Sequence, residues 1–309
     1  MRDHRPVRAR PGHQVWWALA LIGVLGACSG GTEEAERPAA PATTTTTAPP
    51  SGTFTALSYN VAGLPQGINA DQMPEQHQPL ISPLLNAYDV VLLQEDFGFY
   101  TDVLRAEIDH EFVSEPHPGP AVTNPIGRES AAVGDGLNVL SRLPIGDLER
   151  VPWTGCGPAS GDCLALKGFA ATDLTLAPGT TVALYTLHVE AGRDDAALRG
   201  DDLDQLAAHL AAEVPGAVLI GGDWNLEYAD DPDGEQLRGF LAATGLQDVC
   251  DVLDCGADAD VIDRFLFRSG DDVTLTPTRH HFERETFVDG AGAPLSDHDP
   301  LAVDWSWST

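Results

Sequence analysis

The sequence predicts an α/β fold, because apolar runs of strand length alternate with segments of helical spacing. The chain has 309 residues, and 43% of them are hydrophobic. Roughly 250 residues remain after an N-terminal leader, which suits one large domain better than several small ones. We therefore expect one folded domain and no repeat array.

Three helices are predicted between the strands. The clearest is Asp195–Glu213, where leucines recur at helical spacing and aspartates crowd the first turns, as the helix dipole favours. The others lie near Gln78–Asn86 and Glu235–Thr244. The predicted strands are Phe54–Val61, Asp89–Gln94, Gly136–Ser141, Gly168–Leu176, Val182–Val189, Ala217–Gly221, Val261–Phe267 and Leu301–Trp305.

Residues 1–27 have the character of a bacterial lipoprotein signal peptide. Arginines begin the chain, the apolar stretch Val15–Leu25 is short for a bilayer span, and small residues follow. The segment Leu25–Cys28 matches a lipoprotein cleavage box, in which Cys28 becomes the lipid-bearing first residue. We expect export to the cell envelope with a lipid anchor in the membrane. Ordinary cleavage near Ala27, giving a secreted protein, is the alternative.

Residues 28–52 are rich in Thr, Pro and Ala, a composition that buries too little apolar surface to order itself. We interpret them as a disordered tether that precedes a folded domain at residues 53–309.

The chain is strongly acidic, with 17 Lys and Arg against 47 Asp and Glu and a net charge of −30. Without residues 1–27 the counts become 13 and 46, so the net charge is −33. Such a surface repels polyanions, which disfavours nucleic acid as a partner. We expect a monomer.

Four cysteines remain if Cys28 carries lipid, and they lie close in sequence as Cys156/Cys163 and Cys250/Cys255. In an oxidising compartment the simplest arrangement is two short-loop disulfides, although the sequence leaves the connectivity open. A four-cysteine zinc site is the competing interpretation, but neither pair has the tighter Cys-x-x-Cys spacing.

Polar side chains follow most of the predicted strands. Groups at the ends of buried strands are held rigidly at one rim, where α/β folds keep their sites. An imidazole can take a proton from water near neutral pH, and carboxylates can hold a divalent cation. The set therefore predicts phosphoester chemistry. Its members are Asn60, Glu95, His188, Asp223, Asn225, Asp263, Asp297 and His298.

In this order the segments resemble the endonuclease/exonuclease/phosphatase superfamily, which includes deoxyribonuclease I-like nucleases, inositol-phosphate phosphatases and bacterial sphingomyelinases. The resemblance runs from about Thr53 to Trp305. It implies a four-layer sandwich of two packed mixed β-sheets flanked by helices, with residues 53–309 as the catalytic domain. The segments that carry it are Leu57–Val61, Val91–Glu95, Tyr185–Val189, Asp223–Asn225, Ile262–Phe265 and Asp297–His298.

The resemblance implies Mg²⁺, or another divalent cation such as Mn²⁺, with Glu95 as the main ligand and Asn60 and Asp297 beside it. Glu95 ends a buried apolar run, and a buried carboxylate needs a cation or strong donors. A structural salt bridge is the alternative, but basic residues are scarce. Asn60 in isolation would be a turn residue.

His298 is the candidate general base, and Asp263 would hold one imidazole nitrogen so that the other faces water. The alternative partner of Asp263 is Arg264 or another cation. Asp223 and Asn225 are two residues apart, so in an extended segment their side chains face the same way.

The resemblance implies that Asp223 positions water or a second cation, while Asn225 and His188 contact the phosphoryl group. An Asx turn at residues 223–225 and a structural histidine at position 188 are the alternatives.

Lys167 is the only lysine in the sequence and precedes a predicted strand. A compact ammonium there can reach a phosphate as a point charge, so we expect it to bind substrate. The segments around it are most similar to the bacterial sphingomyelinase branch. Leu187 and Asp299 depart from the family pattern. The aromatic candidates for membrane contact are Trp153 and the Phe97–Tyr100 cluster.

The leading hypothesis is an exported Mg²⁺-dependent phosphoric ester hydrolase of the sphingomyelinase or phospholipase C type, which acts on a phospholipid headgroup through metal-activated water. An extracellular deoxyribonuclease-like nuclease is the second hypothesis, although nucleases normally follow the phosphate backbone with Lys and Arg. A catalytically silent binding module is the third.

Overall fold

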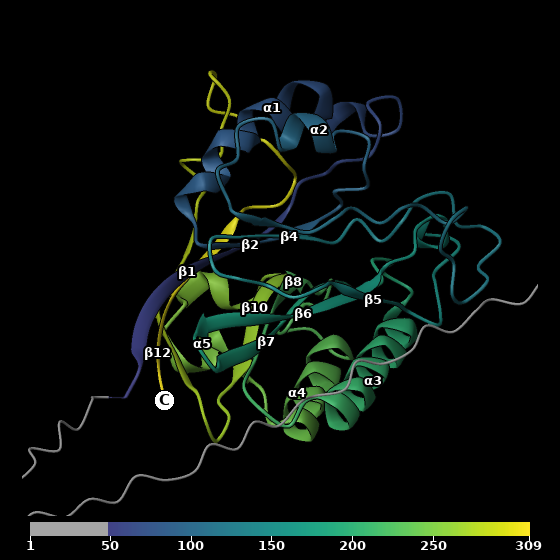
Figure 1. Cartoon of the computed structure of the whole chain (residues 1–309). Coiled ribbons are helices and arrows are strands. Elements are labelled where there is room, and N and C mark those ends of the chain that lie inside the picture. The colour runs from purple at the N-terminus through teal and green to yellow at the C-terminus, as the bar shows by residue number, and fades with distance from the viewer. Residues whose placement is uncertain (1–48) are drawn as a thin grey trace, which may run out of the picture. The chain divides into compact units, whose positions relative to one another are not determined.

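Twelve strands form two mixed sheets of six in the computed structural model, which describes residues 49–309 (Figure 1). The predicted signal peptide, Cys28 and most of the predicted tether lie outside the described residues. The first sheet has the order β11 (Thr274–Phe282), β12 (Leu301–Ser308), β1 (Ser51–Asn60), β2 (Val90–Gln94), β4 (Asn138–Ser141), β3 (Phe112–Val113). The second has the order β5 (Glu149–Pro152), β6 (Gly168–Ala177), β7 (Thr180–His188), β8 (Val218–Asp223), β10 (Asp263–Arg268), β9 (Gln247–Asp248).

Helices cover the outer face of each sheet (Figure 1). Leucines of α3 (Ala196–Glu213) and α4 (Asp233–Thr244) pack on the second sheet. Residues of α1 (Pro74–Leu84) and α2 (Thr101–Leu104) pack on the first. The remaining helices are short, namely α5 (Val249–Val252) and the 3₁₀ turns Ala70–Gln72, Leu85–Ala87, Asp162–Leu164 and Gly256–Ala259.

The core between the sheets is made by inward-facing side chains of both, including Phe54 and Trp305 from the first sheet and Leu219 and Phe265 from the second. In β1, Phe54 and Ala56 belong to this inter-sheet core, whereas Leu57 and Tyr59 belong to the cluster under α1. A strand buried on both faces reads as a nearly continuous apolar run, as in the neighbouring β2, whose five residues are all buried. The predicted α/β sandwich of two packed mixed sheets is confirmed.

Several predicted boundaries are wrong. Strand β1 begins at Ser51, because Ser51 and Gly52 pair with Ser308 and Trp307, so the predicted tether is two residues too long. Helix α1 begins at Pro74 rather than near Gln78, since its prolines hide the helical pattern. Strands β3, β5, β9 and β11 were not predicted, because they are short or lie at sheet edges with mixed exposure.

Two disulfides join Cys156 to Cys163 and Cys250 to Cys255. The prediction of two short-loop disulfides is confirmed, and the zinc interpretation is wrong because these sulfurs are bonded to one another. Within the described range, no helix is both long enough and apolar enough to cross a membrane.

Candidate active site

The two sheets bring the predicted polar residues to one shared edge. Asn60 ends β1 and Glu95 follows β2, its parallel neighbour, while His188 and Asp223 end the parallel pair β7 and β8. Antiparallel β10 starts at the same edge, and its register pairs Asp263 with Asp223. Asp223 is thus the partner of both His188 and Asp263 in the sheet. Strand register, which no local pattern encodes, fixes this arrangement.

Asn60 connects the carboxylates of the two sheets. Its Nδ2 donates to Glu95 Oε1 and to Asp223 Oδ2, each at 3.2 Å. Its Oδ1 accepts from the backbone N–H of Ala62 at 3.0 Å. Both interpretations of Asn60 therefore describe part of its geometry, because the amide stabilises its own turn with one end and faces the site with the other.

Glu95 adopts a left-handed backbone conformation with φ of 58°. Side chains rarely take this conformation, and such strain persists only where the surroundings impose it. Gly63 allows the close approach, because a Cβ at that position would lie 2.3 Å from the Glu95 carbonyl oxygen. Burial raises the pKa of the Glu95 carboxyl above its usual value, against the opposing effect of the Asn60 amide. A strained, partly desolvated carboxylate at a strand end is typical of a functional position.

His298 and Asp263 form a close pair, with 2.8 Å between Nδ1 and Oδ2. The other imidazole nitrogen of His298, Nε2, lies 3.6 Å from Asp223 Oδ2. Burial lowers the pKa of His298, but the charges of Asp223 and Asp263 outweigh it and raise the pKa to about 10. Arg264 pairs instead with Asp248 at 2.9 Å, so Asp263 does not pair with its neighbour.

His188 is 2% exposed, and its Nε2 lies 3.2 Å from Asp223 Oδ2. Burial and the positive charges of Lys167 and His298 lower the pKa of His188 well below its usual value, so its imidazole is neutral. Burial raises the pKa of Asp223 to about 6. The structure brings Asn60, Glu95, His188, Asp223, Asp263 and His298 into one cluster.

Asn225 does not continue the strand, so the expectation of an extended segment is wrong. Its φ is 50°, and its backbone N–H donates to Asp223 Oδ1 at 3.1 Å, which is an Asx turn. The Asn225 Nδ2 donates to Val189 O at 3.0 Å. The turn still leaves Asn225 at the wall of the cavity that Glu95, His188, Asp223 and His298 line.

Asp297 is exposed and is not among the residues lining this cavity. The Ser296 hydroxyl donates to Asn60 O at 2.7 Å, and its oxygen lies 3.3 Å from Asp297 Oδ1. Ser296 thereby links the loop before His298 to the end of β1. The one sequence signal for Ser296 is its position next to Asp297 and His298. The linking role of Ser296 was not predicted. The ligand role of Asp297 stays a prediction.

Trp153 is buried, and its indole N–H donates to His188 O at 2.8 Å, so its nomination for membrane contact is wrong. Phe99, from the other nominated cluster, is half exposed at the mouth of the cavity. Asp299, which departs from the family pattern, pairs with Arg284 at 2.5 Å. This departure is accommodated by a surface ion pair.

The cavity has a volume of about 420 Å³ and two unlike walls. The polar lining residues are Glu95, Ser160, Asp162, Lys167, His188, Asp223, Asn225 and His298. Lys167 is 5% exposed and pairs with Asp162 at 2.7 Å. Among residues 49–309, no arginine lines the cavity. The apolar lining residues, here called the apolar wall, are Leu64, Pro65, Ile68, Phe97, Phe99, Ala132, Val133, Leu164 and Ala165.

The donor set of the cluster suits a hard divalent cation. Oxygen and imidazole ligand atoms of Asp223, Asp263 and His298 lie within 4.8 Å of one another, and Glu95 joins them through Asn60. One oxygen of Asp263 is buried without a hydrogen-bond partner. Carboxylate oxygens are ligands that Mg²⁺ accepts. The residues therefore fit the cation that the family resemblance implies.

A two-sheet α/β sandwich with carboxylates, amides and an imidazole–carboxylate pair at one sheet edge defines a recognised class of protein. The chain belongs to the Endonuclease/Exonuclease/phosphatase family, whose model matches residues 57–298. The predicted resemblance to this superfamily is thereby confirmed.

Curated relatives are named sphingomyelinase. Those of *Mycobacterium bovis* and *Mycobacterium tuberculosis* are 32% identical over 273 residues, which is 83% of this chain and 53% of each relative. The chain thus spans about half the length of the curated relatives it matches.

Solved structures share the fold. Beta toxin from *Staphylococcus aureus* aligns with a TM-score of 0.58 at 16% identity, covering 81% of this chain and 99% of the toxin chain. Sphingomyelinase C from Streptomyces griseocarneus aligns with a TM-score of 0.57 at 21% identity, covering 82% of this chain and 99% of that chain. TDP2 from D. rerio with a single-strand DNA product aligns with a TM-score of 0.56 at 19% identity, covering 82% of this chain and 98% of that chain.

Proposed function

We propose that the chain is a metal-dependent phosphodiesterase that hydrolyses sphingomyelin or a similar choline phospholipid. The observation that carries the proposal is the joint placement of the Asp263–His298 pair and the buried acids Glu95 and Asp223 in a cavity whose other wall is apolar. The polar half can act on a phosphodiester, and the apolar half can contact the lipid next to it.

His298 acts as the general base in this proposal. Its Nδ1–H donates to Asp263, so Nε2 is the nitrogen that takes a proton from the attacking water. The water oxygen bonds to phosphorus, the bond between phosphorus and the lipid oxygen breaks, and the alkoxide takes up a proton from solvent. His298 then returns its proton to solvent. The products are a headgroup phosphate monoester and the lipid alcohol.

The other polar groups bind and orient the phosphoryl group. His188 is neutral and buried, so it can contribute a hydrogen bond without a charge. The Asn225 side chain is fixed by its hydrogen bond to the backbone carbonyl of Val189, the residue after His188. Lys167 places one positive charge on the same wall. We assign these three residues to contact with phosphoryl oxygens.

Glu95 would hold the cation, with Asn60 and Asp223 beside it and Asp297 as a further predicted ligand. When bound, a divalent cation would offset the carboxylate charge that raises the pKa of His298 and would neutralise charge on the phosphoryl and leaving oxygens. A structure of *S. aureus* beta toxin with bound magnesium ions has the same fold, which supports Mg²⁺.

The relatives named sphingomyelinase and the apolar wall favour a lipid over nucleic acid. Most arginines of the described residues pair with aspartates, as in Arg150–Asp135 and Arg199–Asp233, and none lines the cavity. A nuclease would need such side chains along the phosphate backbone. The two disulfides support export. The lipid anchor at Cys28 and the monomeric state stay predictions.

The test offers purified protein sphingomyelin, phosphatidylcholine, duplex DNA and inositol phosphates, with Mg²⁺ or with chelator. We expect release of phosphorylcholine from sphingomyelin with Mg²⁺, loss of that activity in chelator, and loss in a Glu95→Gln variant. Efficient cleavage of DNA with sphingomyelin untouched would contradict the lipid assignment.

A further inference from the structure

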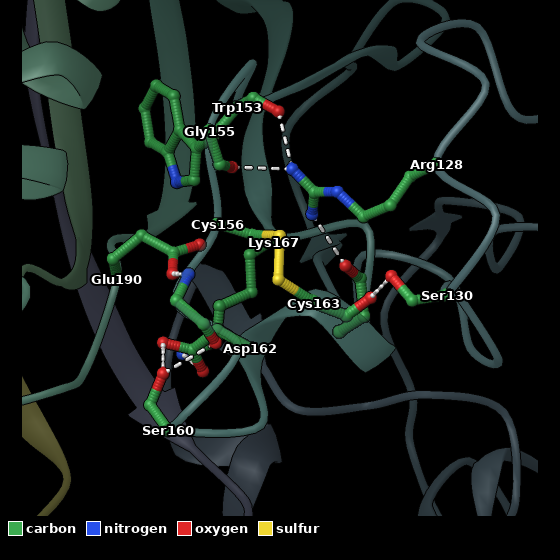
Figure 2. Close-up of a disulfide and its surroundings, with 12 residues drawn as sticks. Arg128, Ser130, Trp153, Gly155, Cys156, Ser160, Asp162, Cys163, Lys167 and Glu190 are labelled. Atoms are coloured by element: carbon green, nitrogen blue, oxygen red, sulfur yellow. Dashed lines mark hydrogen bonds and ion pairs between the residues drawn. A yellow bond between two sulfur atoms is a disulfide. The ribbon is translucent and has the colours of Figure 1, made fainter.

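A second group of carboxylates lies beside the Cys156–Cys163 disulfide, outside the cluster described above (Figure 2). Oxygen atoms of Asp162, Glu190 and Asp195 lie within 4.8 Å of one another. Asp162 comes from the loop that the disulfide closes, and the other two come from the connection between β7 and α3. Asp162 and Glu190 are buried, and Asp195 is half-buried.

Glu190 has a buried oxygen without a partner. The side chain is 0% exposed, and its Oε2 accepts from the backbone N–H of Gly157 at 2.6 Å. Its Oε1 has no hydrogen-bond partner among the described residues. Ligand oxygens of Glu190 and Asp162 lie within 4.8 Å of each other. An unsatisfied carboxylate oxygen that faces a second carboxylate is costly unless a proton or a cation joins them.

Ser160 shows the same excess of acceptors. Its hydroxyl oxygen lies 2.9 Å from Gly157 O, 3.2 Å from Asp162 Oδ2 and 3.1 Å from Asp195 Oδ2. A hydroxyl carries one proton, so it can donate to only one of these three oxygens. The other two contacts place oxygen against oxygen. This group has more acceptors than protons to satisfy them.

Nearby basic side chains do not balance the charge. Lys167 covers one oxygen of Asp162 at 2.7 Å. Arg128 donates to the carbonyls of Trp153, Gly155 and Ala165, and Arg199 is bound to Asp233. A fourth buried carboxylate, Asp202, accepts from the Glu190 backbone N–H at 3.3 Å.

We propose that Asp162, Glu190 and Asp195 bind a divalent cation, with the Ser160 hydroxyl beside them, and that Ca²⁺ is preferred. The ligands are all oxygen, which excludes a soft-metal preference. Mg²⁺ demands near-octahedral geometry and gives up its water reluctantly, whereas Ca²⁺ accepts many protein oxygens in flexible geometry, which suits two buried carboxylates and a half-buried one. The ion would join the disulfide loop to the connection before α3. This inference does not depend on the proposed function.

Calorimetric titration of the full chain with Ca²⁺, at saturating Mg²⁺, tests the proposal directly. We expect wild-type protein to bind Ca²⁺ and its Tm to rise by several degrees, because a ligand that binds only the folded state stabilises it. Glu190→Gln keeps an acceptor for Gly157 but removes the charge, and Asp195→Asn changes a half-buried ligand that is easier to accommodate. Both variants should lose the calorimetric signal and the Ca²⁺-dependent shift in Tm.

Asp271→Asn is the matched control, since Asp271 is exposed and lies outside the group. It should bind Ca²⁺ as wild-type protein does. Absence of Ca²⁺ binding in wild-type protein would overturn the proposal even if a variant failed to fold. Unchanged binding in both Glu190→Gln and Asp195→Asn would overturn it as well.

Discussion

The two carboxylate groups that neighbour Lys167 differ in how their negative charge is balanced. In the active-site cluster Asp263 pairs with His298, and both Glu95 and Asp223 accept from Asn60. Each group keeps one buried oxygen without a hydrogen-bond partner among the described residues, Asp263 Oδ1 in the first and Glu190 Oε1 in the second. The partners differ, because the first group contacts the His298 imidazole and the Asn60 amide, whereas the basic side chain that pairs with the second group is Lys167.

This difference teaches what each group can do. Imidazole partners can gain and lose protons, so the first group can carry out acid–base chemistry. The second group has no such partner among the described residues, and its unmet need is for positive charge. Substitutions in the first should therefore change turnover more than stability. Substitutions in the second should change stability and ion binding more than turnover.

The largest effect is expected for His298→Gln, which removes the proposed base. The kcat for sphingomyelin hydrolysis at saturating Mg²⁺ should fall by roughly 10²- to 10⁴-fold, the usual contribution of a positioned general base. The Tm should change little. The matched control is His281→Gln, because His281 pairs with Glu283 away from the cavity. Equal losses in both variants would remove the distinction between the clusters.

A smaller loss is expected for Asp263→Asn, which removes the partner that orients His298. The kcat should fall by about 10- to 100-fold, as for other groups that orient a functional imidazole. The carboxylates of Asp223 and Asp263 raise the pKa of His298 against the effect of burial. Removal of one charge lowers that pKa, so the imidazole stays deprotonated to lower pH and the acidic limb of kcat/KM moves down. A loss of rate with an unmoved limb would indicate a merely structural role.

The third prediction concerns Glu190, in the second group. Burial raises the pKa of Glu190 from 4.5 to about 7, so the folded state holds this proton more tightly than the unfolded state. Stability from this group is therefore present below about pH 4.5 and is lost as the pH rises towards about 7.

The Gln side chain of Glu190→Gln does not ionise. In chelator, the free energy of unfolding of this variant should therefore fall by on the order of 2 kcal/mol less than that of wild-type protein over this pH range. Urea unfolding of both proteins across this pH range measures it. Added Ca²⁺ should stabilise only wild-type protein, so that it becomes more stable than Glu190→Gln at the upper end of the pH range. Parallel pH profiles in chelator would argue against an uncompensated charge at Glu190.

The smallest effect is expected at the apolar wall of the cavity. Phe99 is 50% exposed and Leu164 is 56% exposed, so replacement of either by Ser should leave the Tm nearly unchanged. If they contact lipid, each loss of buried apolar area should raise KM on sphingomyelin vesicles by about 10-fold. KM for a soluble short-chain substrate should stay the same. Equal effects on both substrates would place these side chains outside the lipid contact.

Sequence reasoning found the α/β class because buried strands such as β2, with the sequence VVLLQ, read as apolar runs. It failed for β11, an edge strand of mixed exposure, and for the start of α1, where prolines interrupt the pattern. The order of motifs also led to the cluster residues, since each follows or begins a strand at one edge.

The rest depends on tertiary structure. No local pattern could show that Asn225 ends in an Asx turn, or that Trp153 is buried under the site. The aspartates of α3 were attributed to the helix dipole, yet its first turn has none and Asp202 faces the Glu190 backbone. The second carboxylate group was missed because its members are close only in the folded chain.

The most direct test of the central claim, that this site directs water to a phosphodiester phosphorus, is hydrolysis of sphingomyelin in ¹⁸O-labelled water followed by mass spectrometry of both products. The account predicts label in the phosphorylcholine and none in the ceramide, with far less labelled product from His298→Gln over the same time. Label in the ceramide, or equal labelling by the variant, would contradict it.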